Sequence, residues 1–515
     1  RAPSGPGRPM EEEVPWRMED IQHIPGQEAR QDAPWTGTSP TRRVAAGLKR
    51  TFTLTLESYA FGPAASFAPG LDSDDAGAFA EGYRACRRTS SIRSSVLSEV
   101  GSMVPSRVPS RDWTPNDGTS SFSASVANLT KSMVGIGMLT LPRAFADCSV
   151  LLAVGALMFC GALSAVSFFL LGYCAHVTNT RTLPQLWEAT VGPRSTPFVE
   201  LIVLVDTSLS CVAFALLMAD YATLSVGGLC PQLPELARSR RSLVALIVLS
   251  VLLPLCMAKR LSLLRLSSMV GLACTLYVFS HVVGDFAVGA AEEQVQLQWF
   301  RFRPAGLLSG TARFAVAFMA HFNAPAFYAD LKGRRPSSFA AVAAIAYTIA
   351  FLVYVSFGFS GYAVFGESVP GNALASYELS RSVLLMWLGM GVCVVASFPL
   401  LFAALRDALL RLLSRAAGVY LDARGRSGQA ITVVAVVLIT FIGAESEDLS
   451  VVVSLTGALS GTTLAFIIPG AVTLSLKRRR TRVFSALGWV LLVVGSALAV
   501  ASFVAVVCRD ILEVI

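Results

Sequence analysis

The stretch from Asn128 to Pro142 places a charged side chain and two glycines inside an apolar segment. Lys131 stands one helical turn before Gly135, and Gly137 follows two residues later. A charged side chain at the centre of a membrane helix costs about 2.5–3.5 kcal/mol on insertion scales, and glycines weaken a helix. Irregular backbone survives at membrane depth only where protein or a water-filled cavity surrounds it. The stretch therefore predicts a ligand site rather than a simple anchor.

A second interruption is expected between Ala320 and Pro325, in a later apolar segment. Pro325 has no amide hydrogen to donate, and the polar side chains of His321 and Asn323 must find partners. Interruptions at corresponding places in two halves of a chain are the best sequence indication of a transporter site at the membrane midplane.

The two interruptions differ in the groups that they leave free. Free amides at the first one, in Val134, Gly135, Ile136 and Gly137, suit a carboxylate. Free carbonyls at the second, in Phe318 to His321, suit an ammonium group. Together they predict a site for an amino acid zwitterion. For the glycines alone, the alternative is a small-residue packing face between helices.

Lys131 also allows two interpretations. It is either a built-in positive charge that occupies a cation position or titrates during transport, or a lysine that snorkels or pairs statically with Asp206 or Asp220. Asp206 is also the candidate partner for a cationic substrate. His281 and Asp285 stand four residues apart, but no further ligands can be placed beside them, so no metal site is predicted.

The elements that position these residues are membrane helices. The chain is 54% hydrophobic and 15% charged, whereas soluble proteins carry about 25% charged residues. This composition predicts an all-α, multi-pass membrane protein. From residue 120 to 515 we expect a transporter domain of eleven spans, at 121–145, 150–176, 197–225, 241–257, 265–290, 308–329, 337–364, 382–405, 428–444, 449–475 and 484–508.

The charges in the loops predict the orientation of these spans. Eighteen Lys and Arg residues fall on the side of the N-terminus and nine on the other side, where Arg313 is counted as an edge residue. This bias places the N-terminus in the cytoplasm. The first ten spans are expected to form two inverted halves of five. Cys148 and Cys230 fall in predicted exoplasmic loops, where a pairing is possible but free thiols are favoured.

Residues 1–119 have a different composition, rich in Pro, Gly, Ser and Arg, and predict a disordered cytoplasmic tail. Ser90 follows two arginines and is a candidate phosphorylation site, with an unused surface serine as the alternative. Residues 51–69 are mildly apolar and are a candidate surface segment. The start of the sequence lacks the apolar run of a cleavable signal peptide, so none is predicted.

Several blocks of the sequence resemble the amino acid/auxin permease family, also called the transmembrane amino acid transporter family. The similarity runs from about Ser120 to Leu476 and is carried by their order and spacing. The blocks are Asn128–Lys131 with Gly135–Pro142, Leu217–Asp220, Pro254–Ser268, His321–Lys332, Gly358–Gly366, and Asp448 with Ser454–Ala458 and Pro469. The resemblance implies a leucine-transporter-like fold of five plus five spans and one more, which moves amino acids by alternating access.

The resemblance also bears on the coupling ion. In the sodium-coupled branch, an asparagine stands where this chain has Lys131, and a threonine of the eighth helix aligns with Ser397. A fixed ammonium group at this place repels Na⁺. The proton-coupled branch has lysine there, and the segment that ends at Asp220 also resembles that branch. Asp330 and Ala404 depart from the family pattern, which has glutamate and proline at these positions.

We therefore expect a secondary amino acid transporter, with H⁺ as coupling ion and with Lys131, Ser397 and Asp220 as the ion-coupling residues. An amino acid sensor with little flux, whose tail binds cytoplasmic partners, is the alternative. The protein is expected in the plasma membrane or in a vacuolar or lysosomal membrane, surrounded by lipid. Neither a nucleic acid partner, nor a cofactor, nor an enzyme activity is predicted, because no catalytic or phosphate-binding motif occurs.

Overall fold

The computed structural model describes residues 118–257, 265–289, 295–423, 425–476 and 481–511. Helices and loops make up this part of the chain, and within it a lone β-bridge pairs Ser120 with Leu331. The predicted tail of residues 1–119, with Ser90 and the segment 51–69, lies outside the described residues except for Gly118 and Thr119.

Eight helical segments of the described residues are long and apolar enough to cross a membrane. They are α6 (Val150–Thr178), α8 (Thr196–Leu229) with η3 (Pro193–Ser195), α10 (Arg240–Ile247) with η4 (Val248–Leu252) and α11 (Leu253–Met257), α15 (Pro336–Phe365) with η7 (Gly366–Ser368), α16 (Arg381–Ala417), α17 (Arg426–Glu445), α18 (Leu449–Thr456) with η9 (Gly457–Gly461), η10 (Thr463–Ile467) and α19 (Ile468–Ser475), and α20 (Arg482–Ala505), which continues into η11 (Val506–Ile511).

Three further predicted spans have a different form. The first consists of α4 (Phe122–Met133), η2 (Ile136–Thr140) and α5 (Leu141–Cys148), and the sixth of α13 (Pro304–Ala317), η6 (His321–Asn323) and α14 (Ala324–Asp330). The fifth is the continuous helix α12 (Arg265–Ala287). Short helices α7 (Leu183–Thr190), α9 (Glu235–Arg238) and η8 (Ala373–Ser376) lie in the loops. The number of eleven spans remains a prediction.

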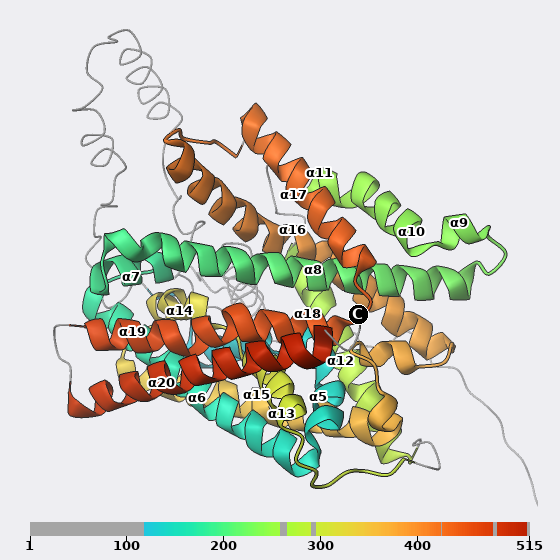
Figure 1. Cartoon of the computed structure of the whole chain (residues 1–515), viewed down its shortest axis with the longest axis horizontal. Coiled ribbons are helices and arrows are strands. Elements are labelled where there is room, and N and C mark those ends of the chain that lie inside the picture. The colour runs from blue at the N-terminus through green and yellow to red at the C-terminus, as the bar shows by residue number, and fades with distance from the viewer. Residues whose placement is uncertain (1–117, 258–264, 290–294, 424, 477–480, 512–515) are drawn as a thin grey trace, which may run out of the picture. The chain divides into compact units, whose positions relative to one another are not determined.

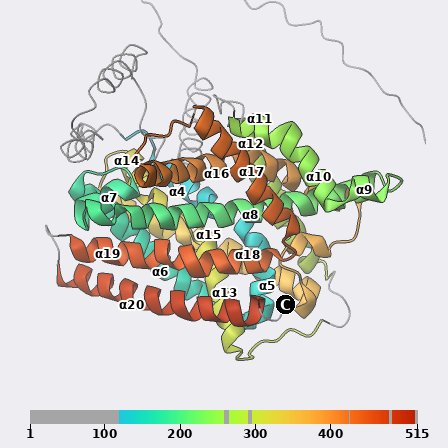
Figure 2. The ribbon, with the colours of Figure 1, turned by 45° about the horizontal axis from the view of Figure 1, so that its top comes forward.

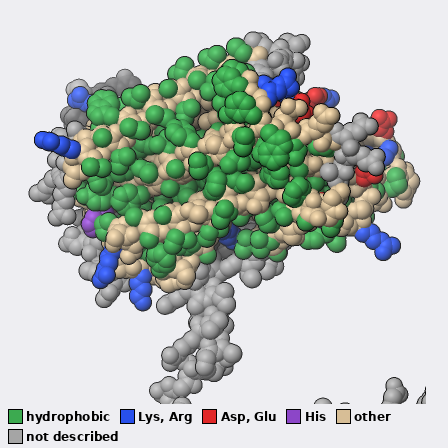
Figure 3. All heavy atoms as spheres, turned by 90° about the horizontal axis from the view of Figure 1, so that it is seen from below, with side chains coloured by type: hydrophobic (Ala, Val, Ile, Leu, Met, Phe, Trp, Pro, Cys, Tyr) green, Lys and Arg blue, Asp and Glu red, His purple; other side chains and the backbone are tan. Residues whose placement is uncertain are grey.

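The surface agrees with a membrane location. Apolar side chains cover most of the flank seen in Figure 3, and charged side chains gather mainly towards its two ends. Such a belt suits contact with lipid tails, since apolar surface of this extent is unusual on a soluble monomer. The chain is therefore an all-helical, multi-pass membrane protein.

Some helices are longer than the sequence pattern predicted. The third predicted span, 197–225, continues in α8 to Leu229, and the eighth, 382–405, continues in α16 to Ala417. The second extension carries Arg411 and Arg415, which hydropathy excludes from a span although the helix itself continues. Gly418, with φ 63°, adopts the left-handed conformation that commonly ends a helix.

The helix bundle has two opposite faces, at which the two broken spans begin and end. The proximal face is the side on which α4 begins and α14 ends, and the distal face is the side on which α5 ends and α13 begins. α16 packs along α8, and α18 and α19 follow each other end to end, with α20 packed against α19 (Figures 1 and 2).

An aromatic core joins α6, α13 and α15 behind the second interruption. Phe318 stacks on Tyr347 with ring centroids 5.8 Å apart and meets Tyr354 edge-on at 5.2 Å. Gly161 of α6 lets the Phe318 ring approach, since a Cβ at this glycine would lie 2.9 Å from the ring. These contacts fix the place at which α13 ends.

Candidate functional site

The first predicted interruption is present in the structure. α4 ends at Met133, Val134 turns to an extended conformation (φ −73°, ψ 98°), and Gly135 has φ −157° and ψ −147°. The chain then resumes as the 3₁₀ helix η2. Because Ile136 and Gly137 open this helix, their amides have no partner within it. The Val134 amide, by contrast, is engaged, because it donates to the Thr130 carbonyl at 2.8 Å. Binding of a carboxylate at this break stays a prediction.

The second predicted interruption is also present and begins slightly earlier, at Phe318 rather than Ala320. α13 ends at Ala317, Phe318 leaves the helix with ψ 13°, and Ala320 has φ −145° and ψ 3°. Pro325 lies in the first turn of α14, where its missing amide hydrogen costs no helical bond.

Two tyrosines of α15 bind the carbonyls at the end of α13. The Tyr354 hydroxyl donates to the Ala317 carbonyl at 2.6 Å, and the Tyr347 hydroxyl donates to the Phe318 carbonyl at 3.3 Å. A carbonyl oxygen has two lone pairs, so each retains acceptor capacity for an ammonium group. Sequence reasoning missed both tyrosines. Tyr347 binds one predicted acceptor, the Phe318 carbonyl, and Tyr354 binds the Ala317 carbonyl just before it.

The two breaks face each other. A Cβ at Gly137 would lie 3.8 Å from the Cα of Ala317, the last residue of α13. A Cβ at Gly135 would meet nothing within 4 Å. The backbone at Gly137 therefore packs against the end of α13, with open space beside Gly135.

The side chains of Phe318 and His321 do not point into the open space beside Gly135. Phe318 is fully buried in the aromatic core, and the buried His321 ring points to α6. There Nε2 lies 2.8 Å from the Ser167 hydroxyl and 3.1 Å from the Ser164 carbonyl. Their side chains are thus engaged in packing and in contacts with α6, and the predicted use of their carbonyls stays a prediction.

Lys131 and Ser397 lie in one neighbourhood, joined by Cys393. The half-buried Lys131 is within electrostatic reach of the Cys393 thiol, and Cys393 shares a hydrogen bond with Ser397 one turn further along α16. Lys131 therefore lies near this part of α16, and a role of Lys131 and Ser397 in ion coupling stays a prediction. Neither Asp206 nor Asp220 is the partner expected for Lys131, because they contact Ser460 and Arg240.

Asp220 belongs to a separate cluster on the distal face. Arg240 donates to its Oδ1 at 2.5 Å, and the Asn372 side-chain amide donates to its Oδ2 at 3.0 Å. These residues, with Glu447 and Asp448, line a cavity of about 360 Å³. Asn372 lies in the loop between α15 and α16, so Asp220 holds that loop against α8 instead of joining Lys131 and Ser397.

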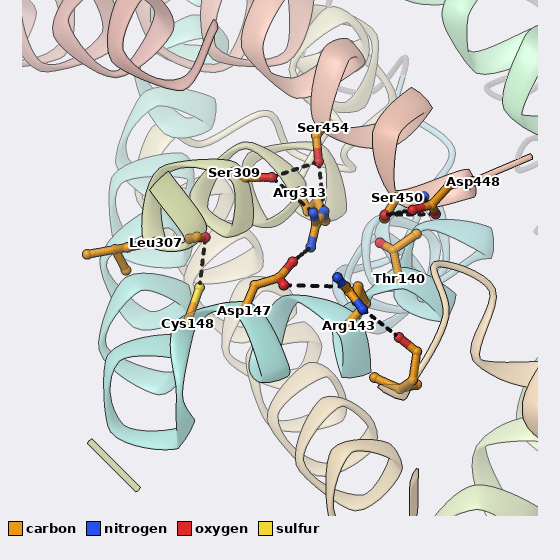
Figure 4. Close-up of polar contacts among 12 residues, drawn as sticks. Thr140, Arg143, Asp147, Cys148, Leu307, Ser309, Arg313, Asp448, Ser450 and Ser454 are labelled. Carbon is orange, nitrogen blue, oxygen red and sulfur yellow. Dashed lines mark hydrogen bonds and ion pairs between the residues drawn. The ribbon is translucent and has the colours of Figure 1, made fainter. Parts of the chain in front are cut away.

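A buried ionic network links the distal halves of the two broken helices (Figure 4). Arg313 of α13 is 1% exposed and donates to Asp147 Oδ2 of α5 at 2.6 Å. It also donates to Ser454 of α18 at 2.7 Å and to Ser309 at 2.9 Å. Arg143 approaches the other carboxylate oxygen of Asp147 at 3.3 Å. The assignment of Arg313 to the span edges was wrong, because its guanidinium is neutralised inside the bundle.

On the proximal face, backbone pairing joins the beginning of the first span to the end of the sixth. Ser120 donates its amide to the Asp330 carbonyl at 3.0 Å and accepts from the Lys332 amide at 2.9 Å. The Thr119 hydroxyl adds a bond of 2.7 Å to the Asp330 carboxylate. Asp330, which departs from the family glutamate, thus helps to join the two broken spans.

The remaining predicted groups have structural surroundings. Cys148 is buried at the end of α5 rather than in a loop, and neither it nor Cys230 forms a disulfide within the described residues. His281 Nδ1 lies 2.9 Å from Asp285 Oδ2, and the Tyr377 hydroxyl donates to the same oxygen at 2.6 Å. Burial and this carboxylate raise the pKa of Tyr377. Within the described ranges, no three His, Cys, Asp or Glu side chains are arranged to hold a metal ion.

Comparison with known proteins identifies the family. The sequence profile described as transmembrane amino acid transporter protein matches residues 118–508. The chain belongs to this family. The resemblance deduced from the sequence blocks is thereby confirmed, and the match includes both interruptions.

Curated relatives carry transporter names. Vacuolar amino acid transporter 7 of Saccharomyces cerevisiae is 28% identical over 309 residues, which are 57% of this chain and 60% of that protein. Amino acid transporter AVT6E of Arabidopsis thaliana is 24% identical over 405 residues, with coverages of 75% and 82%. Solute carrier family 38 member 10 of Homo sapiens is 24% identical over 365 residues, with coverages of 67% and 32%. The chain therefore spans less than two thirds of the yeast and human relatives.

A solved structure shows a similar fold. Mhp1, a nucleobase-cation-symport-1 family transporter in a closed conformation with bromovinylhydantoin bound, matches with a TM-score of 0.50 and 11% identity. The match covers 79% of this chain and 94% of that one. At this identity, the likeness concerns the fold alone.

Proposed function

We propose that this member of the amino acid transporter family moves amino acids across a membrane by alternating access, with eleven spans arranged as two inverted halves of five plus one. The observation that carries the proposal is the pair of opposed breaks. Gly137 lies against the end of α13, and space is open beside Gly135. The substrate carboxylate binds amides from Gly135 to Gly137, since the Val134 amide donates to Thr130, and the substrate ammonium group binds carbonyls from Phe318 to His321.

This assignment uses backbone groups at both ends of the substrate. Amides at a helix start attract negative charge, and carbonyls at a helix end attract positive charge. The buried Tyr347 fixes the Phe318 carbonyl in advance, and Tyr354 fixes the preceding Ala317 carbonyl, which lowers the ordering cost of binding. Selectivity among amino acids would come from the side chains around this site. The proposed substrate class is therefore amino acids in general.

We infer that transport is coupled to protons rather than sodium. Lys131 places an ammonium group near Cys393 and Ser397, where a bound Na⁺ would need neutral oxygen ligands. Two positive charges 4 Å apart repel each other by about 4 kcal/mol at an effective dielectric constant of 20. Lys131 and Ser397 thus shape a cation site that the lysine itself occupies.

A vacuolar or lysosomal membrane is the proposed location, with the N-terminus in the cytoplasm. Relatives from two yeasts are named vacuolar amino acid transporters. An acidic lumen supplies the proton gradient that this transporter would use. The proximal face, where the backbones of Ser120 and Asp330 are hydrogen-bonded, would then be the cytoplasmic side.

Uptake into proteoliposomes tests the proposal. The purified protein is reconstituted, and accumulation of a radiolabelled mixture of the standard amino acids is measured under an imposed proton gradient, under a sodium gradient and under neither. Accumulation under the proton gradient alone is expected. Strict dependence on sodium would refute proton coupling, and absence of uptake under every gradient would refute transport.

A further inference from the structure

Asp206 is a buried carboxyl group that the proposed substrate site does not use. It lies within α8 and is 8% exposed. Its Oδ1 lies 2.8 Å from the Ser460 hydroxyl of η9. An ionisable residue inside a membrane span is costly, and it persists where it carries out a function.

Ser460 has more acceptors than it has hydrogens. Its Oγ lies 2.8 Å from Asp206 Oδ1 and 2.9 Å from the Thr456 carbonyl oxygen. A hydroxyl has a single hydrogen to donate, so it cannot serve both acceptors fully. When Asp206 is protonated, its O–H donates to Ser460, and Ser460 donates to the Thr456 carbonyl. The geometry is therefore complete with a neutral carboxylic acid.

The charged groups of neighbouring helices are engaged elsewhere. Arg411 and Arg415 of α16 pair with Glu200 near the proximal face, and Arg240 of α10 pairs with Asp220 near the distal face. Among the described residues, Asp206 has the hydrogen bond with Ser460 and no ion pair. None of the other titratable groups on α8 and on the helices packed against it forms a hydrogen bond or ion pair with this carboxyl group in the described part of the chain; they are Cys211, Tyr221, Glu188, Arg194, Glu235, Arg238, Arg241, Arg381, Cys393, Arg406, Asp407, Arg426 and Glu445.

Asp206 is connected to the second break through η9. Gly461 follows Ser460, and a Cβ at this glycine would lie 3.3 Å from Val316 and 3.5 Å from Met319, on either side of the end of α13. η9 is π-helical, a form that occurs mostly as single turns and is frequent at functional sites. A change in the bond between Asp206 and Ser460 is therefore close enough to alter the substrate site.

We propose that Asp206 carries the coupled proton, with Ser460 as its hydrogen-bond partner. Asp206 binds one proton from the side to which the transporter is open. The transporter then changes conformation while Asp206 is a neutral acid, and Asp206 releases the proton on the other side. This assignment rests on the proposed function, because it names the residue through which proton coupling acts.

The test compares Asp206→Asn with the unmutated protein in two modes of transport. Asparagine keeps the shape and neutrality of the protonated acid but cannot release a proton. Exchange of labelled for unlabelled amino acid mixture, at equal pH on both sides, requires no proton release. We expect this exchange to remain within about threefold, while accumulation driven by a proton gradient falls to a ratio of about one. Glu445→Gln, a matched carboxyl-to-amide change at the bundle surface, is expected to keep both.

The outcomes separate this assignment from the proposed function. Proton-driven accumulation that persists in Asp206→Asn overturns the role of Asp206 while leaving the transporter proposal intact. Loss of exchange by a protein that is monodisperse in detergent also overturns it, since the role is then structural. If the unmutated protein exchanges amino acids without responding to a proton gradient, the coupling proposal itself fails. Should Asp206→Asn not fold, Ser460→Ala is measured instead, and an unchanged pH dependence of its uptake overturns the assignment.

Discussion

Replacing Asp147 by asparagine should destabilise the protein strongly, because it removes the carboxylate that neutralises Arg313. The guanidinium of Arg313 is 1% exposed and lies 2.6 Å from Asp147. Asparagine has nearly the same shape, so the change removes charge without opening a cavity. The hydrogen bonds from Arg313 to Ser309 and Ser454 remain, but they carry no opposing charge. Breaking a buried pair by removing one partner costs about 3–5 kcal/mol.

A double-mutant cycle separates the ion pair from other effects of the substitution. Arg313→Met fills much of the same volume without charge, and Asp147→Asn with Arg313→Met leaves neither charge buried. The double variant should therefore be more stable than the sum of the two single changes predicts, by about 1–3 kcal/mol. Unfolding in increasing mole fractions of SDS, followed by tryptophan fluorescence, gives the free energies of unfolding.

An exposed ion pair provides the control. Arg241 and Glu445 form two hydrogen bonds, at 2.6 and 2.7 Å, yet the Arg241 side chain is 77% exposed. Glu445→Gln should change the unfolding transition little, because water and salt screen such pairs. The reasoning is refuted if Asp147→Asn unfolds at the same SDS fraction as the unmutated protein, or if the two single changes are additive.

Three further predictions concern the proposed substrate site. Gly135→Ala should leave thermal stability unchanged, since its methyl group meets nothing within 4 Å. The same methyl group should raise the KM for uptake about tenfold by filling space that the substrate occupies. An unchanged KM would contradict the site. Lys131→Asn should introduce sodium dependence while changing the substrate KM less than threefold, as measured by uptake under each gradient; continued indifference to sodium would contradict the role of the lysine. Tyr354→Phe should lower the free energy of unfolding by about 1–2 kcal/mol, because the buried Ala317 carbonyl loses its donor; equal unfolding midpoints would argue against that bond.

The helix breaks could be predicted from the sequence because their causes are local. Gly135 and Gly137 weaken a helix wherever they stand, and Pro325 cannot donate an amide hydrogen in any fold. The structure interrupts the first span at Val134 and Gly135 and the sixth span between Ala317 and His321, a few residues before Pro325. The lengths of α8 and α16 were less predictable, since hydropathy records where the apolar stretch ends rather than where the helix ends. The tyrosines that bind the α13 carbonyls had no distinguishing signal among other aromatic residues of an apolar helix.

Polar partners inside the bundle could not be predicted, because they meet only after the helices pack. Asp147 and Arg313 are 166 residues apart, and Asp206 and Ser460 are 254 apart. In lipid, every buried polar group must find a partner within the protein, so each such residue indicates that a partner exists without naming it. The chemistry of the partner then decides the role. A guanidinium opposite Asp147 makes that carboxylate a fixed charge that joins two helices, whereas a hydroxyl opposite Asp206 leaves a group that can gain and lose a proton.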